Sequence, residues 1–337
     1  MPSNYRIGVI GGGVVGLSSA LHVATQHPNV DITVISDRDT TLTTSYGPGG
    51  LFRPSLKVPS AVTKQWARDS WEHYTSLCKS SDGPLAGVQF VSGYCLGDNI
   101  SWLKDQERDY GDIVANFRWL DESEMDIFTV PFKHGFFYTA TITQTHYYMP
   151  WLAQHARLAG CKFERQQVNN LTDLSDRFDL LINCTGLGAR RLVPDESVVP
   201  VRGITVNVSA SWIKHFLLCH DSMTFMIPGL DGIFLGTVRQ ESSWKMEVDQ
   251  SERQEILDRC YQIMPSLKRA AFKETWVGLR PHRPQPRLEI EVLKTGNGST
   301  PIIHNYGHGG NGVTLSWGSA IHVNRLLNEQ LRMKSRL

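Results

Sequence analysis

Three glycines near the amino terminus give the first indication of chemistry. Gly11, Gly13 and Gly16 form a G-x-G-x-x-G motif between a short apolar run and a stretch with helical spacing of apolar residues. In such a motif the first glycine permits a tight turn, the second lets the backbone approach a pyrophosphate, and the third allows close helix-strand packing. The amino-terminal end of the helix adds partial positive charge. Because a purely structural turn can carry the same pattern, the interpretation depends on the residues that come after the motif.

An acidic residue comes after the glycines at the spacing that a dinucleotide site needs. Residues 30–35 are apolar and β-branched, which favours a strand, and Asp37 comes at their end, 21 positions beyond Gly16. A carboxylate there can accept hydrogen bonds from the ribose hydroxyls of an adenosine. Strand, helix, second strand and acid together predict a dinucleotide-binding unit, and they leave both NAD and FAD open.

A run of hydroxyls and glycines comes next. Thr43, Thr44 and Ser45 could bond phosphate oxygens, and Gly49 and Gly50 would let the backbone pass close to a flat ring. A solvated polar loop explains the same residues, so this run supports a cofactor site without requiring one.

Two stretches in the last quarter of the chain carry further candidate groups. His304 and His308 are four residues apart, but they lie outside a helical pattern and have no acid beside them, which argues against a metal site. A mobile glycine loop is the other interpretation. Arg280 opens a proline-rich stretch through residue 287 that has the composition of a linker. Taken alone, Arg280 is expected to pair with an acid where two domains meet.

These residues need elements that bring them together, and the apolar periodicity predicts such elements. Helices are expected at residues 61–78, 147–159, 251–263 and 315–331, besides the one that comes after the glycine motif. Strands are expected at residues 6–10, 30–35, 178–182, 203–208, 223–227, 232–236 and 302–303, with another from Cys161. The parallel-sheet features are far apart along the chain, which indicates two interleaved domains, each assembled from discontinuous segments.

Composition limits the class of protein. The chain has 337 residues, enough for one large domain or two ordinary ones, and its 34 Lys and Arg balance 33 Asp and Glu without a run of like charges. This balance argues against nucleic acid or an anionic membrane as a partner. No apolar stretch reaches the length of a membrane span and no signal peptide is apparent, so we expect a soluble protein outside the secretory route. The six scattered cysteines are expected to be reduced thiols.

Several spaced motifs resemble those of one known family. Residues 302–312 read IIHNYGHGGNG and are followed by WGSA at 317–320, while residues 183–189 and 278–284 read NCTGLGA and GLRPHRP. In this order the motifs resemble the D-amino-acid oxidase family of FAD enzymes, and the resemblance covers nearly the whole chain. It implies FAD as the cofactor, no metal, and an α/β fold. The expected architecture is an FAD-binding Rossmann-like domain with an interleaved α+β substrate domain containing a mostly antiparallel sheet.

The resemblance also implies domain limits and cofactor contacts. The FAD-binding domain is expected to comprise residues 1–52, 141–199 and 288–337, and the substrate-binding domain residues 53–140 and 200–287. The expected FAD contacts are Gly11, Gly13, Val14, Val15, Gly16, Asp37, Arg38, Thr43, Thr44, Ser45, Gly49, Gly50, Leu51, Val168, Gly309, Gly310, Gly312, Val313 and Thr314.

Two arginines and one backbone carbonyl are expected to bind the substrate. By resemblance, Arg280 clamps the α-carboxylate of a D-amino acid and the carbonyl of Gly310 meets its amino group. Family members for acidic substrates carry an arginine at the position of Arg239, whereas those for neutral substrates carry an apolar or aromatic residue. Placed on a strand facing the pocket, Arg239 would pair with a second carboxylate, and a neutral side chain would leave this cation unpaired. The other interpretation is a solvated strand arginine.

The chain departs from the family pattern at a few positions. Phe225 stands where the family has a lid tyrosine that supports the α-carboxylate, so a bond worth roughly 1 kcal/mol is expected to be lost. A second acid-binding arginine of some relatives aligns near Leu218 and is missing, and Arg53 and His220 are the candidates to replace it. Ile204 replaces a glutamine that usually comes after Arg-Gly at that point.

The reaction expected from the resemblance is oxidation of an acidic D-amino acid, D-aspartate or D-glutamate. Hydride transfer from Cα to flavin N5, with dioxygen as the second substrate, would yield a 2-oxo acid, ammonia and hydrogen peroxide. An oxidase for neutral D-amino acids is the nearest alternative. A flavin-binding protein without turnover and an NAD-dependent dehydrogenase are further alternatives, although the latter would leave the glycine loop at residues 307–312 unexplained.

The final tripeptide predicts a location in the cell. Ser335, Arg336 and Leu337 are close to Ser-Lys-Leu, the peroxisomal address, and Arg336 keeps its cation. An oxidase that produces hydrogen peroxide belongs where peroxide is destroyed. We therefore expect import into the peroxisome matrix, with the import receptor as a partner.

Overall fold

The protein consists of one long mixed sheet with helices on its faces. The computed structural model describes residues 5–55, 60–295 and 298–334. Fourteen strands form the sheet in these residues: β1 (Tyr5–Ile10), β2 (Val30–Ser36), β3 (Val88–Gly97), β4 (Ala115–Trp119), β5 (His134–Thr143), β6 (Lys162–Arg165), β7 (Leu180–Asn183), β8 (Val199–Ser209), β9 (Phe216–Cys219), β10 (Thr224–Pro228), β11 (Ile233–Gly236), β12 (Gln240–Glu241), β13 (Ala271–Thr295) and β14 (Gly298–His308). The helices are α1 (Val14–Gln26), α2 (Ala61–Cys78), α3 (Ile100–Gln106), α4 (Glu122–Met125), α5 (Thr145–Leu158), α6 (Ala189–Leu192), α7 (Gln250–Ile263) and α8 (Gly312–Lys334).

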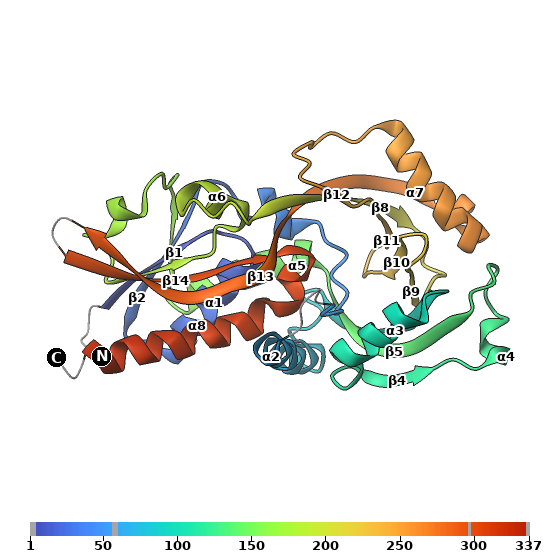
Figure 1. Cartoon of the computed structure of the whole chain (residues 1–337), viewed down its shortest axis with the longest axis horizontal. Coiled ribbons are helices and arrows are strands. Elements are labelled where there is room, and N and C mark those ends of the chain that lie inside the picture. Colours follow the sequence, from blue (N-terminus) through green and yellow to red (C-terminus); the bar gives the residue numbers. More distant parts are fainter. Residues whose placement is uncertain (1–4, 56–59, 296–297, 335–337) are drawn as a thin grey trace.

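One half of the sheet is parallel and forms the left lobe of Figure 1. Its order is β14-β7-β1-β2-β6, and all four neighbouring pairs are parallel. α1 connects β1 to β2 and packs against both α5 and α8. The apolar residues that recur along α1, among them Leu17 and Ala20, are fully buried. The predicted strand-helix-strand unit around the glycine motif is therefore confirmed.

The other half of the sheet is mostly antiparallel and forms the right lobe of Figure 1. Its order is β4-β5-β3-β9-β10-β11-β8, in which β3 and β9 are the parallel pair. α7 packs on β8, β10 and β11, and its apolar residues join a second buried cluster with those strands. A parallel sheet joined to a mostly antiparallel one is the expected α/β fold class.

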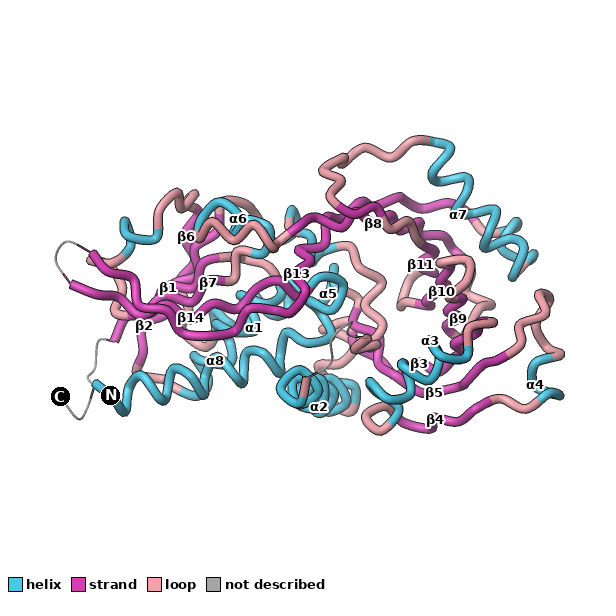
Figure 2. Tube along the Cα trace, in the orientation of Figure 1, coloured by secondary structure: helices cyan, strands magenta, loops and turns pink. Residues whose placement is uncertain are grey.

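A single strand of 25 residues, β13, runs through both lobes (Figure 2). Its first part pairs with β8 from Ala271 to His282, and its second part pairs with β14 from His282 to Thr295. The pairing register shifts between His282 and Arg287, where the chain carries two prolines. Proline cannot donate to a strand ladder and is tolerated at such irregularities. The stretch with the composition of a linker is therefore a strand that joins the lobes, and the predicted domain limits stay a prediction.

The helices expected from the sequence are present, with small differences at their ends. α2 has the predicted limits, whereas α5, α7 and α8 begin one to three residues earlier than expected. All six cysteines are free thiols. In the part of the chain that the structure describes, no helix is long and apolar enough to cross a membrane.

Candidate active site

The glycine motif forms a tight turn at the carboxyl ends of β1, β2 and β7. Gly11 has φ +119°, and a Cβ there would lie 2.4 Å from the carbonyl oxygen of Cys184. A Cβ on Gly16 would lie 1.9 Å from the carbonyl oxygen of Gly11, so the third glycine lets the helix close on the turn. The amide of Gly11 donates to the carbonyl of Ile35 at 2.8 Å, which fixes the turn to β2. The turn therefore places the amino-terminal end of α1 at the carboxyl ends of these strands.

The hydroxyl and glycine run lies between the start of α1 and the long strand β13. Ser45 accepts a hydrogen bond from the amide of Val14 at 3.0 Å, and α1 has no other side-chain cap. The hydroxyl of Thr44 donates to the carbonyl of Leu279 at 3.1 Å, one residue before Arg280. Gly50 has φ +68°, where a Cβ would lie 1.9 Å from the carbonyl oxygen of Thr143. The run therefore connects the phosphate end of the candidate site to the arginine on β13.

The acid after β2 is already paired with its neighbour. Arg38 and Asp37 form a two-pronged ion pair with N–O distances of 3.0 and 2.6 Å, and both side chains are exposed. The hydrogen bond from Arg38 is the main cause that lowers the pKa of Asp37. Val168 lies in the same region, because it packs on the buried cluster that contains Ile10 and Ile35. These predicted contacts thus lie in one region, near the carboxyl ends of β1 and β2.

The glycine loop between β14 and α8 passes from the start of α1 to Arg280. A Cβ on Gly312 would lie 4.0 Å from Val14, and one on Gly310 would lie 3.7 Å from Cδ of Arg280. Val313 and Thr314 lie in the first turn of α8 and are buried. The carbonyl of Val313 accepts a hydrogen bond from the buried Tyr74 at 2.6 Å. The loop therefore brings predicted cofactor residues and the predicted substrate arginine to one place.

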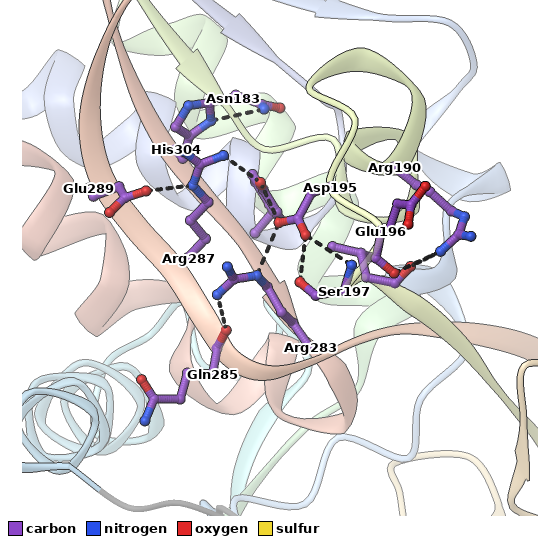
Figure 3. Close-up of polar contacts among 12 residues, drawn as sticks. Asn183, Arg190, Asp195, Glu196, Ser197, Arg283, Gln285, Arg287, Glu289 and His304 are labelled. Atoms are coloured by element: carbon purple, nitrogen blue, oxygen red, sulfur yellow. Dashed lines mark hydrogen bonds and ion pairs between the residues drawn. The ribbon is translucent and has the colours of Figure 1, made fainter.

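A polar network supports the base of this loop (Figure 3). Asp195 accepts hydrogen bonds from Arg283 at 3.0 Å and from the hydroxyl of Tyr306 at 2.8 Å. Burial raises the pKa of Asp195, but the hydrogen bonds from Ser197 and Tyr306 and the charge of Arg283 outweigh it and lower this pKa to about 2. Arg283 also lies over Gly307, where a Cβ would come within 2.9 Å of its own. Arg283, the second arginine of the proline-rich stretch, thus has a structural role, since it connects Asp195 to the loop at Gly307.

The two histidines of the loop are buried separately. His304 lies between Asn183 and Glu291, each 3.1 Å from one ring nitrogen. His308 packs beside the ring of Trp66, and burial lowers the pKa of His308 to about 4. Within residues 5–55, 60–295 and 298–334 no group of three His, Cys, Asp or Glu side chains could hold a metal ion.

Arg280 is held over a glycine and has no acid partner. Its guanidinium lies on β8 at Gly203, where a Cβ would be 2.2 Å from Nη2. Nη2 also lies 3.4 Å from the hydroxyl oxygen of Thr237. No carboxylate of the described chain forms an ion pair with Arg280, so the structure does not support pairing with an acid at the lobe junction. The guanidinium is left available to a ligand.

Two further arginines act on Arg280. Burial is the main cause that lowers the pKa of Arg280, and the charges of Arg239 and Arg53 lower it further, to about 10. Arg280 is therefore still a cation at neutral pH. The segments that carry the other two arginines lie close to it, because Thr237 in the link after β11 is 3.4 Å from Nη2 of Arg280 and Ser55 accepts a hydrogen bond from Asn311, next to Gly310, at 3.0 Å. Like charges that are partly removed from water favour a bound anion between them.

The structure corrects the placement of Arg239. This residue lies in the link between β11 and β12, rather than on a strand, and its side chain is 39% exposed. It pairs with Glu241 at 3.0 Å. The next residue, Gln240, is bonded to the fully buried Arg202, which also pairs with Glu252 at 2.7 Å. Gln240 therefore anchors the carboxyl-terminal end of the link that carries Arg239, although Arg239 itself is exposed.

The structure shows what surrounds the residues at which the chain departs from the family pattern. The ring of Phe225 lies over Gly236, where a Cβ would be 2.2 Å from Cζ, directly before Thr237. Leu218 pairs with Phe225 across β9 and β10 and is buried, as is Ile204 in β8. An apolar side chain thus fills the position of the absent second arginine.

Several residues that shape the site were not found from the sequence. Gly203 and Thr237 contact the guanidinium of Arg280 from two other strands or links. Trp276 lies between Gly47 and Gly278, where added Cβ atoms would come within 2.2 and 1.9 Å of its ring. The only sequence signal was the presence of these glycines, since their partners lie far away along the chain.

Comparisons with known proteins agree with this geometry. Residues 6–326 match the family described as FAD dependent oxidoreductase (DAO), and the chain belongs to this family. It is 36% identical to D-aspartate oxidase 1 of Caenorhabditis elegans over 97% of this chain and 98% of that protein, and 35% identical to D-aspartate oxidase of Homo sapiens over 96% and 95%. A D-amino-acid oxidase of Rubrobacter xylanophilus is 32% identical over 94% and 93%.

Oxidases of known structure have the same fold as this chain. The crystal structure of glycine oxidase from Geobacillus kaustophilus superposes with a TM-score of 0.81 at 18% identity, over 97% of this chain and 95% of that chain. L-α-glycerophosphate oxidase from Mycoplasma pneumoniae with FAD bound superposes with a TM-score of 0.77 at 14% identity, over 96% and 95%. The expected fold class, the family and FAD as the cofactor are thereby confirmed.

The residues of this chain fit FAD. The turn at Gly11 and Gly16 leaves no room for side chains, whereas the nearest atoms to added Cβ atoms on Gly310 and Gly312 are 3.7 and 4.0 Å away. The free space beside the loop suits the flat ring of FAD, and the first turn of α1 suits the pyrophosphate of FAD. The individual FAD contacts expected from the sequence stay a prediction.

Proposed function

We propose that the protein oxidises acidic D-amino acids, with D-aspartate as the preferred substrate and D-glutamate as a second one. The observation that carries the proposal is that Arg280, which is half-buried and has no carboxylate partner among the described residues, lies beside the segments that carry Arg239 and Arg53. A monocarboxylate would neutralise one of these charges, whereas a dicarboxylate would neutralise two. The relatives named D-aspartate oxidase support the same substrate class.

In this mechanism the chain contributes binding and orientation. Arg280, fixed by Gly203 and Thr237, binds the α-carboxylate through its planar fork of donors. The carbonyl of Gly310, next to Arg280, accepts a hydrogen bond from the substrate amine. Arg239 exchanges Glu241 for the second carboxylate, which is possible because that ion pair is exposed and worth little. Together these contacts fix the Cα hydrogen on the side of the glycine loop.

FAD, when bound along this loop, supplies the acceptor for the hydride from Cα. Because the amine binds to the carbonyl of Gly310 in its neutral form while Arg280 holds the α-carboxylate, the mechanism needs no side chain as general base, and orientation carries the catalysis. The imino product leaves the site and hydrolyses in water to a 2-oxo acid and ammonia. Dioxygen is the second substrate, and hydrogen peroxide is the second product.

A neutral D-amino acid is the alternative substrate. Two observations favour it: Arg239 is already neutralised by Glu241, and Phe225 presents an apolar ring beside Gly236. The D-amino-acid oxidase relative from Rubrobacter xylanophilus supports this alternative. Arg53 argues against it, because a neutral side chain would leave this third cation without a counterion.

The proposal extends to the location of the enzyme. Ser335, Arg336 and Leu337 lie outside the described residues, and their resemblance to the peroxisomal address supports import by its receptor. A peroxide-producing reaction is consistent with this compartment. Deletion of the tripeptide from a fluorescent fusion is expected to move the protein from peroxisomes to the cytosol.

The test is a peroxide assay of the FAD-loaded enzyme with D-aspartate, D-glutamate and D-alanine. We expect kcat/KM to be highest for D-aspartate, and we expect Arg239→Leu to lower it about 10-fold or more while kcat/KM for D-alanine stays within about 2-fold. The control is Arg68→Leu, which removes an exposed arginine of α2 that pairs with Asp112 at the surface. Preference of the wild-type enzyme for D-alanine would overturn the proposal in favour of the neutral alternative.

A further inference from the structure

Arg53 projects from a backbone that is fixed on both sides. The amide of Phe52 donates to the carbonyl of Thr141 at 2.8 Å, and the carbonyl of Ser55 accepts a hydrogen bond from the side-chain amide of Asn311 at 3.0 Å. Phe52 is buried against Trp71, with ring centroids 5.2 Å apart. The direction in which the Arg53 side chain leaves this segment is therefore set by packing.

A stacked pair of rings from two other elements meets the Arg53 guanidinium. Its Cζ lies 5.9 Å from the ring centroid of Trp102, within cation-π range. Trp102 in turn stacks on His220, with ring centroids 3.9 Å apart and planes inclined by 13°. Burial is the main cause that lowers the pKa of His220, so this ring is neutral at neutral pH and stacks without adding a further cation.

Both rings of this stack are themselves held in place. Trp102 lies in the first turn of α3, and its amide donates to the capping side chain of Asn99 at 3.1 Å. His220 comes directly after β9, and its amide donates to the carbonyl of Leu96 at 3.2 Å. The stack is thus a fixed surface rather than a chance contact between two exposed side chains.

Arg53 has no acid partner that would account for this arrangement. In the described ranges of the chain, no carboxylate forms an ion pair with Arg53, unlike Arg239, which pairs with Glu241. A cation held on an aromatic surface keeps its charge and its donors free for a ligand. The side-chain amide of Asn311 donates to the carbonyl of Ser55 at 3.0 Å, and a Cβ on the adjacent Gly310 would lie 3.7 Å from Cδ of Arg280. The segment that carries Arg53 therefore lies beside Arg280, and the charge of Arg53 helps to lower the pKa of Arg280.

We propose that Trp102, stacked on His220, is a positioning residue for substrate specificity. It holds the guanidinium of Arg53 toward Arg280, so that Arg53 serves as a second cation for the side-chain carboxylate of the substrate. This inference rests on the proposed function, since it names how that site distinguishes an acidic from a neutral D-amino acid. It also explains why the site can do without an arginine at the position of the buried Leu218.

The test measures kcat and KM of the FAD-loaded enzyme for D-aspartate and D-alanine in four variants. We expect Arg53→Gln to raise KM for D-aspartate about 10-fold and Trp102→Leu to raise it about 3- to 10-fold, with KM for D-alanine within about 2-fold in both. Trp102→Phe keeps a ring face and is expected to stay close to the wild-type enzyme. The double variant Trp102→Leu/Arg53→Gln is expected to match Arg53→Gln alone.

A purely structural role of Trp102 predicts a different pattern. It would raise KM for D-alanine as much as for D-aspartate, or it would add to the effect of Arg53→Gln, and either result overturns the proposal. Trp212→Leu is the matched control, because Trp212 is an exposed tryptophan between β8 and β9 of the same lobe. Thermal melting of each variant shows whether the fold is retained.

A binding measurement separates this inference from the proposed function. Malonate and acetate are titrated into the FAD-loaded enzyme, and the change in flavin absorbance gives a Kd for each without turnover. Trp102→Leu is expected to raise the Kd for malonate by the same 3- to 10-fold and to leave the Kd for acetate unchanged. If the wild-type enzyme prefers D-alanine as substrate, the proposed function fails, and equal weakening of malonate and acetate by Trp102→Leu is the result that overturns the role of Trp102.

Discussion

The two lobes of the protein build their parts of the site in different ways. In the parallel lobe the candidate FAD site consists mainly of backbone, with glycines at the start of α1 where a side chain would collide. In the antiparallel lobe and at its junction, the candidate substrate site consists of side-chain cations from three separate segments. A backbone site tolerates few substitutions at its glycines, whereas a side-chain site can change its specificity one residue at a time.

The largest effect is expected from breaking the backbone site. Gly16→Ala places a Cβ within 1.9 Å of the carbonyl oxygen of Gly11, so the turn cannot close. We expect purified protein to retain less than about a tenth of its bound flavin, measured as flavin absorbance per mole of protein. Gly111→Ala is the control, because its Cβ would meet the flexible side chain of Glu107 at 3.3 Å. Normal flavin content in Gly16→Ala would mean that the turn does not hold the pyrophosphate.

A smaller effect is expected from the buried anchor of the substrate lobe. Arg202 is fully buried and pairs with Glu252, so Glu252→Gln leaves its charge uncompensated. We expect the free energy of unfolding to fall by about 3 kcal/mol and KM for D-aspartate to rise, because Gln240 beside Arg239 loses a partner. The control is Glu255→Gln in the same helix, whose exposed pair with Arg259 should contribute less than about 1 kcal/mol. Equal loss of stability in both variants would contradict the role of Glu252 as the buried partner of Arg202.

The ion pair of Arg202 and Glu252 also predicts how the free energy of unfolding depends on pH. The hydrogen bond from Arg202 is the main cause that lowers the pKa of Glu252 from 4.5 to about 2 in the folded protein. Because the folded value is the lower one, the stabilisation is fully present above about pH 4.5 and is lost as pH falls toward 2. Urea unfolding between these pH values is expected to show a shallower decline in Glu252→Gln than in the wild-type protein. Parallel declines would show that Glu252 does not carry this dependence.

The smallest effect is expected from restoring the lid hydroxyl. Phe225→Tyr adds a donor over Gly236, next to Thr237 and Arg280, which should lower KM by about 5-fold through one hydrogen bond to a charged acceptor. Because that bond goes to the α-carboxylate, D-aspartate and D-alanine should gain equally. Phe90→Tyr is the control at an exposed position. A gain confined to one of the two substrates would place the hydroxyl elsewhere.

The contrast between the lobes also explains which features the sequence could predict. The turn at Gly11 and Gly16 and the acid at residue 37 come one after another within a single strand-helix-strand unit, so local spacing is enough to find them. The stack of Arg53, Trp102 and His220 joins residues that are about 50 and 120 positions apart, and no local pattern indicates it. Arg239 was expected on a strand, but β11 ends at Gly236 and the link to β12 carries it instead. The proline-rich stretch was misleading because its irregular pairing lies inside a long strand.

The central claim is that a cluster of arginines makes the substrate lobe selective for a dicarboxylate. The most direct measurement is the ratio of kcat/KM for D-aspartate to kcat/KM for D-alanine, taken for the wild-type enzyme and for the double variant Arg53→Gln/Arg239→Leu. We predict a ratio of about 100 for the wild-type enzyme that falls to about 1 in the double variant, with flavin content unchanged. A wild-type ratio below 1, or a high ratio that survives in the double variant, would contradict this claim.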